Sequence, residues 1–210
     1  MSSPLTSLFI SVTIVVLAAA QSTSRFDSLI EDLAGTWSTG SGAVRTGPGF
    51  WNPRSQQFTV PRSAGHSFSF TKDGFWEEAL FQWGNDPTYP QCVQATLLWQ
   101  HGNFYIDALN GTLRMDPFLG DGFQSQWTGC DTTSSATSNN TVAPVAAYNQ
   151  VYLYNTPAVS TDSHYGVSSY KLEMAQLSGE LLNPMWKVLN PPTMLPTEVL
   201  HIKVRVLPSR

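Results

Sequence analysis

"HSFSFTKDGFWEEALFQW", residues His66–Trp83, is the stretch that decides the fold. Two aromatic-rich runs flank Asp73-Gly74, and Asp-Gly between apolar runs is a strong signal for a β-hairpin. Successive side chains of a strand point to opposite faces, so the second run has two different faces. One face carries Glu77 with the apolar residues Phe75, Ala79, Phe81 and Trp83. The other face carries Glu78 with Trp76 and Leu80.

A β-meander is predicted after this hairpin. "VQATLLWQ" should turn at His101-Gly102 into "NFYIDAL", which should turn at a two-residue tip, Asn110-Gly111, into "GTLRMDP". Alternation predicts that four apolar side chains face inward: Phe104, Ile106, Leu113 and Met115. Their neighbours should face outward: Tyr105, Thr112, Arg114 and Asp116.

Further strand candidates are "YNQVYLYN", "SSYKLEM" and "MWKVL", whereas residues 26–34 are expected to form a short helix. About nine or ten strands with few short helices predict an all-β single domain, built as an antiparallel β-barrel or as a sandwich. "LAGTWS", residues Leu33–Ser38, resembles the N-terminal signature of lipocalins, in which the Trp plugs one barrel end. We therefore expect Trp37 in the core.

The chain is poor in charged residues. Asp, Glu, Lys and Arg make up 12% of its 210 residues, against about 25% in ordinary soluble proteins. The net charge of −4 and the lack of a basic run argue against a nucleic-acid partner. Aromatic residues at 12%, with 15 Gly and 14 Pro, favour a β-rich domain with many turns.

Residues 1–20 have the features of a signal peptide. They carry no charged side chain, and their apolar run ends with Ala18 and Ala20 at the positions that a signal peptidase reads. The run is too short for a comfortable membrane span, which needs about 20 residues. We therefore expect a signal peptide (1–20), a β-barrel lumenal domain (21–190) and an extended, proline-rich strap that leaves the domain (191–210).

Cysteine and asparagine patterns fit the same compartment. Cys92 and Cys130 are an even, widely spaced pair, which in a secretory compartment is most simply a disulfide. Closing a loop of about 39 residues should stabilise the fold by roughly 4 kcal/mol. Two sequons predict N-glycosylation, at Asn110 and at Asn139.

No pattern in the chain indicates an enzyme, a metal site or a cofactor site. Glu77 and Glu78 point to opposite faces of a strand and cannot form a glycosidase pair. The apolar face around Glu77 predicts a buried carboxyl with a raised pKa, which we expect to pair with a hydroxyl or a cation. The four histidines show no metal-ligand spacing: His66, His101, His164 and His201.

"TGPGFWNP", residues Thr46–Pro53, holds two large rings in a segment that can hardly be regular structure. Exposed apolar patches mark interaction sites. The candidate contacts for client proteins or for a ligand are Phe50, Trp51, Phe75 and Trp76. The alternative is that these rings pack in the core, and the sequence leaves both possibilities open.

Four blocks resemble a known family: "GTWSTGSGAVRTGPGFWNP", "SFSFTKDGFWEEA", "NGTL" and "PPTMLPTEVL". They lie in the same order as in the fungal "reversal of Tor lethality" proteins, and the resemblance covers roughly Gly35 to Leu200. Cys92, Cys130 and the sequon at Asn110 also match that family in position.

This resemblance implies a membrane-anchored, N-glycosylated chaperone of the endoplasmic reticulum. Its partners would be unfolded or maturing secretory glycoproteins, and it would be required for cell-wall β-1,6-glucan synthesis. The alternative function is a non-catalytic barrel that binds a carbohydrate or a lipid. The family continues with a Ser-rich linker and a membrane span, whereas this sequence ends in "HIKVRVLPSR". We expect a sequence that stops short of the span, or else a soluble lumenal form.

Overall fold

The computed structural model describes residues 26–85, 87–88, 93–128 and 145–201. The predicted signal peptide (1–20), both cysteines and Asn139 lie outside these residues. Within the described part, a single helix over residues 26–33 precedes a series of antiparallel strands, so the all-β prediction is confirmed.

The strands are β1 (Gly35–Ser38), β2 (Trp51–Asn52), β3 (Gln57–Phe58), β4 (Gly65–Phe70), β5 (Phe75–Asn85), β6 (Val93–Ile106), β7 (Leu113–Pro117), β8 (Phe123–Thr128), β9 (Val145–Ala147), β10 (Tyr152–Tyr154), β11 (Ala158–His164), β12 (Val167–Glu173) and β13 (Met185–Leu189). Eleven of them form one sheet, with the order β10-β7-β6-β5-β4-β1-β13-β12-β11. On a side branch, β8 pairs with β6 and β9 pairs with β8, while β2 and β3 form a separate hairpin.

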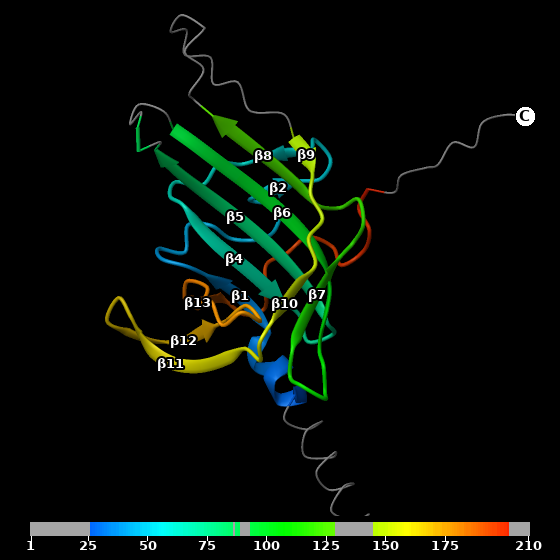
Figure 1. The fold of residues 1–210 in the computed structure, drawn as a ribbon, viewed down its shortest axis with the longest axis vertical. Helices are drawn as coiled ribbons and strands as arrows, with labels where there is room; N and C mark the ends of the chain where they lie inside the picture. Colours follow the sequence, from blue (N-terminus) through cyan, green and yellow to red (C-terminus); the bar gives the residue numbers. More distant parts are fainter. Residues whose placement is uncertain (1–25, 86, 89–92, 129–144, 202–210) are drawn as a thin grey trace, which may run out of the picture.

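The large sheet is strongly curled (Figure 1). Its path ends, β10 and β11, do not pair with each other in the described part of the chain, but an isolated bridge joins Tyr154 to Gln176 just after β12. The Asn155 backbone N–H adds a hydrogen bond to the carbonyl oxygen of Ala175. The sheet therefore encloses a core as a barrel does, without a complete ring of strand pairs.

The Asp73-Gly74 hairpin forms as predicted, but β6 contradicts the turn expected at His101-Gly102. The strand is continuous from Val93 to Ile106. On the side away from β5, its first half pairs with β8 and its second half with β7. Gly102 lies in the β7-paired half, where a Cβ would be 2.0 Å from the carbonyl oxygen of Asp116. A glycine is needed at this position because β7 approaches too closely for a side chain. In the sequence alone, this glycine resembles a turn signal.

The connection between β6 and β7 is longer than the predicted two-residue tip. It covers residues 107–112, and the Gly111 N–H donates to the Asp107 carbonyl oxygen at 2.7 Å. Asn110 is exposed there and Gly111 has a φ of 75°, as expected.

An inner core fills the curl and is closed at one end by the helix. Its buried members are Leu33, Trp37, Phe68, Phe70, Trp76, Phe104, Leu113, Met115, Tyr154, Leu172, Met174 and Met185. Ile106 packs against this cluster and Tyr105 is exposed, so the alternation predicted for β6 is confirmed. Trp37 is fully buried, and its Nε1–H donates to the Leu33 carbonyl oxygen at 2.7 Å, which ties β1 to the helix.

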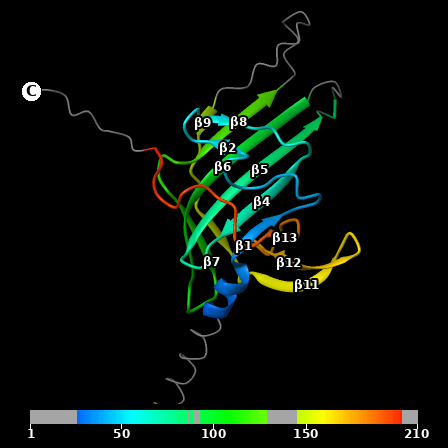
Figure 2. The same ribbon diagram turned by 180° about the vertical axis from the view of Figure 1, so that it is seen from behind.

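An outer core lies on the opposite face of the sheet. Its buried members are Val44, Phe50, Trp51, Ala79, Phe81, Leu97, Trp99 and Leu195. Figure 2 shows β2 lying across this face, over β6 and β8. The cover consists of the aromatic loop and hairpin, residues 44–58, and the proline-rich strap, residues 190–201.

The rings of Phe50 and Trp51 pack inside this outer core. Trp51 is 0% exposed and Phe50 is 2% exposed. The Trp51 ring stacks on Trp99 at 5.6 Å and on Phe123 at 4.9 Å between ring centroids. The hypothesis that these two rings contact clients is therefore wrong, because the face of β6 and β8 already occupies them.

One buried carboxylate ties the cover to the sheet. Glu77 of β5 accepts hydrogen bonds from the Gly47 N–H at 2.6 Å, the Trp99 Nε1–H at 3.0 Å and the Leu195 N–H. Gly47 begins the aromatic loop and Leu195 belongs to the strap, so one side chain fixes both covering segments. Glu77 thus pairs with N–H groups, where a hydroxyl or a cation was expected. Residues 190–201 of the strap stay on the sheet, where an exit from the domain was expected.

Burial raises the pKa of the Glu77 carboxyl to about 7, as predicted in direction. The three N–H donors favour the ionised form and lower the pKa, but removal of the carboxylate from water outweighs them.

A second buried carboxylate, Asp121, fixes the strap further along. It accepts hydrogen bonds from the Leu200 N–H, from the backbone and ring of His201, and from the ring of His101 in β6. Burial by itself raises the pKa of Asp121, but these hydrogen bonds together hold the pKa below its ordinary value. The His201 ring also donates to the Pro53 carbonyl oxygen at 3.0 Å, so strap, sheet and aromatic loop meet at this point.

We predict that Trp51→Ala lowers the free energy of unfolding by about 3–5 kcal/mol, because it removes a buried ring and leaves a cavity. Trp83→Ala is the matched control, since it removes the same ring where 57% of the residue is exposed. It should lower the free energy of unfolding by no more than about 1 kcal/mol. Urea denaturation followed by circular dichroism measures the free energy of unfolding of both variants. Equal losses in the two variants would contradict the conclusion that Trp51 fills the outer core.

The Glu77 pKa predicts a specific dependence of stability on pH. The folded protein holds the carboxyl proton up to a pH of about 7, whereas the unfolded chain releases it near 4.5. Stability should therefore fall as the pH rises through this window, by about 3 kcal/mol in total.

Glu77→Gln cannot titrate and isolates this contribution. Urea denaturation of both proteins at several pH values gives the free energy of unfolding of wild type minus that of the variant. This difference should decrease from pH 4.5 to pH 7. A difference that stays constant, or that increases with pH, would show that Glu77 does not carry the raised pKa.

Candidate functional site

Three rows of side chains cross β5, β6 and β8 on the outer face of the sheet. The strand register places their members directly opposite one another: Ala79–Trp99–Phe123, Phe81–Leu97–Ser125 and Trp83–Ala95–Trp127. Neighbouring strands lie about 4.8 Å apart, so Trp83 and Trp127 stand about 10 Å apart on either side of Ala95. We call this third row, Trp83, Ala95 and Trp127, the aromatic row.

The cover of the outer core ends before the aromatic row. Trp99 in the first row is 0% exposed and Leu97 in the second is 8% exposed. Trp83 is 57% exposed and Trp127 is 43% exposed. The apolar face of the outer core thus continues into solvent as two indole rings, at the end of the sheet where β5 and β8 finish and β6 starts (Figure 1).

The described strand segments around the aromatic row are uncharged. The strand segments that carry the three rows, residues 79–85, 93–99 and 123–128, contain no Asp, Glu, Lys or Arg. Contact with this surface therefore requires no charged partner. An apolar segment could lie on the two rings without removing a charge from water.

The remaining predicted contacts lie elsewhere. Trp76 is 0% exposed and belongs to the inner core, so the hypothesis of a surface contact is wrong for it as well. Phe75 is half-buried, with its ring 6.4 Å from that of Phe118. The structure therefore does not bring the four predicted rings together into one exposed patch.

Sequence reasoning missed the aromatic row for a definable reason. It assigned Trp83 to the face of Glu77 correctly, but it did not identify "FQSQWT", Phe123–Thr128, as a strand. In that segment Phe123, Ser125 and Trp127 alternate with two glutamines, which is the period-two signal of a strand with one apolar face.

The buried ionisable groups serve to hold the fold together. Glu78 faces the inner side of the sheet and contacts the His66 Nε2 at 2.7 Å, while the Gln100 amide donates to its other oxygen at 2.9 Å. His101 is 1% exposed and contacts Asp121, and burial lowers the pKa of its ring despite that carboxylate. In the described residues no group of three or more His, Cys, Asp or Glu could hold a metal ion.

Of the predicted modification sites, the structure describes Asn110 alone. Its side chain is exposed, and its Oδ1 accepts a hydrogen bond from the Thr112 N–H at 2.8 Å. Asn139, Cys92 and Cys130 lie outside the described residues.

No helix in the described segments has both the length and the hydropathy of a membrane span. No solved structure matches this chain.

Several fungal proteins with curated sequences are similar to this chain. The chain is 37% identical to protein ROT1 of Yarrowia lipolytica over 190 residues, which covers 90% of this chain and 73% of that protein. It is 39% identical to protein rot1 of Schizosaccharomyces pombe, covering 85% and 72%. It is 38% identical to protein ROT1 of Saccharomyces cerevisiae, covering 80% and 61%.

The family pattern of Rot1, described as a chaperone for protein folding within the ER in fungi, matches residues 33–206. This range contains every strand of the structure, including the covering segments and the aromatic row. The chain therefore belongs to the Rot1 family of fungal chaperones for protein folding in the endoplasmic reticulum.

Proposed function

We propose that this chain helps secretory glycoproteins to fold in the lumen of the endoplasmic reticulum, and that its aromatic row is the surface that contacts them. The observation that carries this proposal is the continuation of the outer apolar face beyond its cover. A family of folding chaperones needs a surface for apolar segments, and large rings exposed side by side on a rigid sheet supply one.

The geometry suits weak binding without sequence preference. The two indoles offer flat apolar surface, and they stand on strands whose register is fixed by pairing with β6 on both sides. An exposed segment of an unfinished protein would bury its apolar side chains against the rings and would separate again when it folds. No reactive group is needed, so the chain would act without catalysis.

The role in cell-wall β-1,6-glucan synthesis follows as an indirect effect in this proposal. In this proposal the enzymes that build wall polymers are among the glycoproteins that fold with the help of this chain. If their folding depends on this chain, its loss lowers the amount of active enzyme and hence of the glucan.

We also propose a disulfide between Cys92 and Cys130, and N-glycans at Asn110 and Asn139. The register supports the disulfide: Gln94 of β6 is paired with Thr128 of β8, Cys92 stands two residues before Gln94, and Cys130 stands two residues after Thr128. The exposure of Asn110 at the tip between β6 and β7 supports a glycan at that position.

Suppression of aggregation tests the chaperone function. The full chain should slow the light scattering of an unrelated, thermally unfolded protein without glycans. Trp83→Ser combined with Trp127→Ser should remove most of this effect, because the apolar contact is lost. If the wild-type chain leaves the scattering unchanged, the proposed function is wrong.

Tyr165→Ser provides the matched control, since it removes an aromatic ring that is 78% exposed on the β11–β12 hairpin, away from the aromatic row. It should suppress aggregation like wild type, and all variants should keep their melting temperatures within a few degrees. If the double variant works as well as wild type, or if Tyr165→Ser fails equally, the aromatic row is not the contact surface.

Peptide mapping under non-reducing conditions tests the disulfide on protein purified from a secretory host. A single linked peptide pair that contains Cys92 and Cys130 is expected, and it should disappear after reduction. Alkylation of both cysteines before any reductant is added would contradict the pairing.

A further inference from the structure

A cavity of about 560 Å³ opens beside β5, beyond the end of its pairing with β4. The β4–β5 register stops at Gly65 and Phe81, whereas β5 continues to Asn85, and this leaves a notch beside the projecting strand. The notch is bordered by the residues that follow β1 and by those that precede β13. Its volume lies within the range of about 300–1,000 Å³ that is typical of small-molecule sites.

The lining of this notch is neutral and combines amides, a hydroxyl and aromatic rings. The side chains that matter are Thr39, His66, Gln82, Trp83, Asn183 and Trp186. Among the described residues, no Asp, Glu, Lys or Arg lines the notch or the adjoining hollow of about 350 Å³, which shares Gln82 and Trp83 with it.

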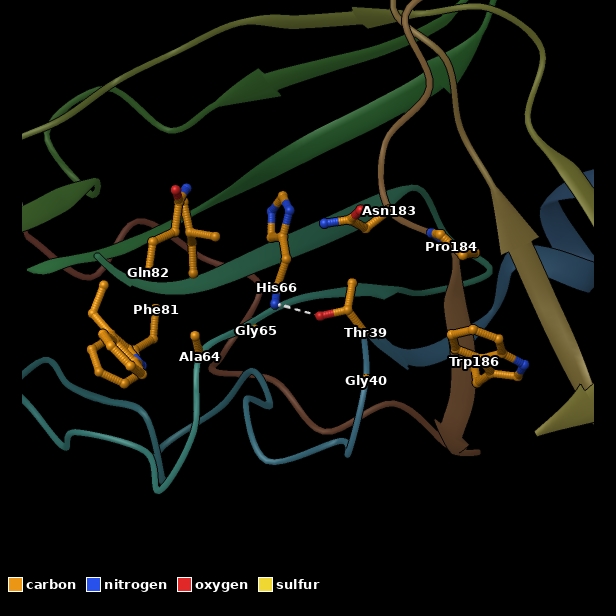
Figure 3. Close-up of a pocket in the computed structure, with 12 residues that line it drawn as sticks. Thr39, Gly40, Ala64, Gly65, His66, Phe81, Gln82, Asn183, Pro184 and Trp186 are labelled. Atoms are coloured by element: carbon orange, nitrogen blue, oxygen red, sulfur yellow. Dashed lines mark hydrogen bonds between the residues drawn. The ribbon is translucent and has the colours of Figure 1, made fainter. Parts of the chain in front are cut away.

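Two amide groups in the notch are unused by the fold. Gln82 and Asn183 are exposed, and in the described part of the chain neither amide has a hydrogen-bond partner. Figure 3 shows Gln82, His66 and Asn183 on the same side of the ribbon, with the His66 ring between the two amides in this view. The notch therefore presents several donors and acceptors at once.

The rings of the notch are held in place from behind. The Nε2 of His66 contacts the buried Glu78 carboxylate at 2.7 Å, and this contact holds the ring in place. Trp186 stacks on His164, with ring centroids 4.0 Å apart and planes at 17°. These contacts fix the two rings before any ligand arrives, which lowers the entropy lost on binding.

We infer that the notch binds a neutral hexopyranose, as part of a glycan. Sugar hydroxyls both donate and accept hydrogen bonds, which suits two amides with a histidine and a threonine hydroxyl. The C–H face of a pyranose ring is apolar and packs on an indole ring such as that of Trp186. A phosphorylated or acidic ligand would lack a cation here, and an apolar peptide would leave both amides unpaired.

This site goes beyond the proposed function, because it would recognise sugar where the aromatic row contacts apolar protein segments. Two sources could supply the sugar: the mannose-rich glycans of folding glycoproteins, or the β-1,6-linked glucose of the cell wall. Only Trp83 belongs to both surfaces. The two sites can therefore be tested with separate substitutions.

Binding is measured by titrating the full chain with an α-1,2-linked mannose disaccharide and, separately, a β-1,6-linked glucose disaccharide, using calorimetry or NMR. At least one of them should bind, and the one that binds identifies the source. Gln82→Ala combined with Asn183→Ala should weaken this binding about tenfold or more, because both amide hydrogen bonds are lost.

Gln126→Ala is the matched control, because it removes an exposed amide of β8 that does not line the notch. It should bind the disaccharide like wild type. Failure of both disaccharides to bind wild type would overturn the inference, as would unchanged binding by the double variant or an equal loss in Gln126→Ala. Displacement of the bound sugar by an unglycosylated apolar peptide would overturn it in favour of a peptide site.

The two proposals fail independently. Gln82→Ala with Asn183→Ala should suppress the aggregation of a client without glycans as well as wild type does. If sugar binding is absent while this suppression is intact, only the notch is wrong; if suppression is absent while the sugar binds, only the chaperone surface is wrong.

Discussion

The constraint on which the rest of the structure depends is that the sheet is apolar on both faces. Its inner face encloses one core by curling, with the helix at one end. Its outer face cannot enclose a core by curling. It has to be covered by segments that do not pair regularly with its strands. Those segments have backbone N–H groups that need partners once they are buried. Glu77 and Asp121 provide those partners, which explains why these two carboxylates lie in the interior of a protein with so few charges.

Partial cover is what makes the outer face functional in this account. The aromatic loop and the strap reach over the first two rows of β5, β6 and β8 and leave the third open. Covered and uncovered rings stand on the same strands: Phe81 and Trp83 are two residues apart on β5, and Phe123 and Trp127 are four residues apart on β8. The exposed indoles thus stand on paired strands that also carry the outer core. A mobile loop with the same rings would collapse onto the protein more easily than it would bind a client.

Much of the fold could be predicted because its signals are local. The Asp73-Gly74 turn and the alternation around Glu77 identify the central hairpin, its two faces and the burial of Glu77. The turn expected at Gly102 was wrong. A glycine is needed there because the carbonyl oxygen of Asp116 on β7 lies too close for a side chain, and no local pattern in the sequence shows that contact. Whether Trp51 is buried could not be decided either, since the rings that enclose it belong to Trp99 and Phe123, far away in sequence.

The candidate site escaped prediction for a related reason. Trp83 was placed on the correct face. Its exposure depends on how far residues 44–58 and the strap extend over the sheet, and the sequence does not show how many rows of side chains they cover. Trp127 lies in a short strand that was not recognised, in which Phe123, Ser125 and Trp127 alternate with two glutamines. The neutral notch likewise arises from the unequal lengths of β4 and β5, which becomes visible only when their register is known.

Oxidative footprinting of the tryptophans tests the central claim most directly, because it reports which rings solvent reaches with and without a denatured client. The account predicts that Trp83 and Trp127 are labelled in the free protein and protected when the client is present, while Trp51 is unlabelled in both states. Labelling of Trp51 in the free protein, or unchanged labelling of Trp83 and Trp127 in the presence of a bound client, would contradict it.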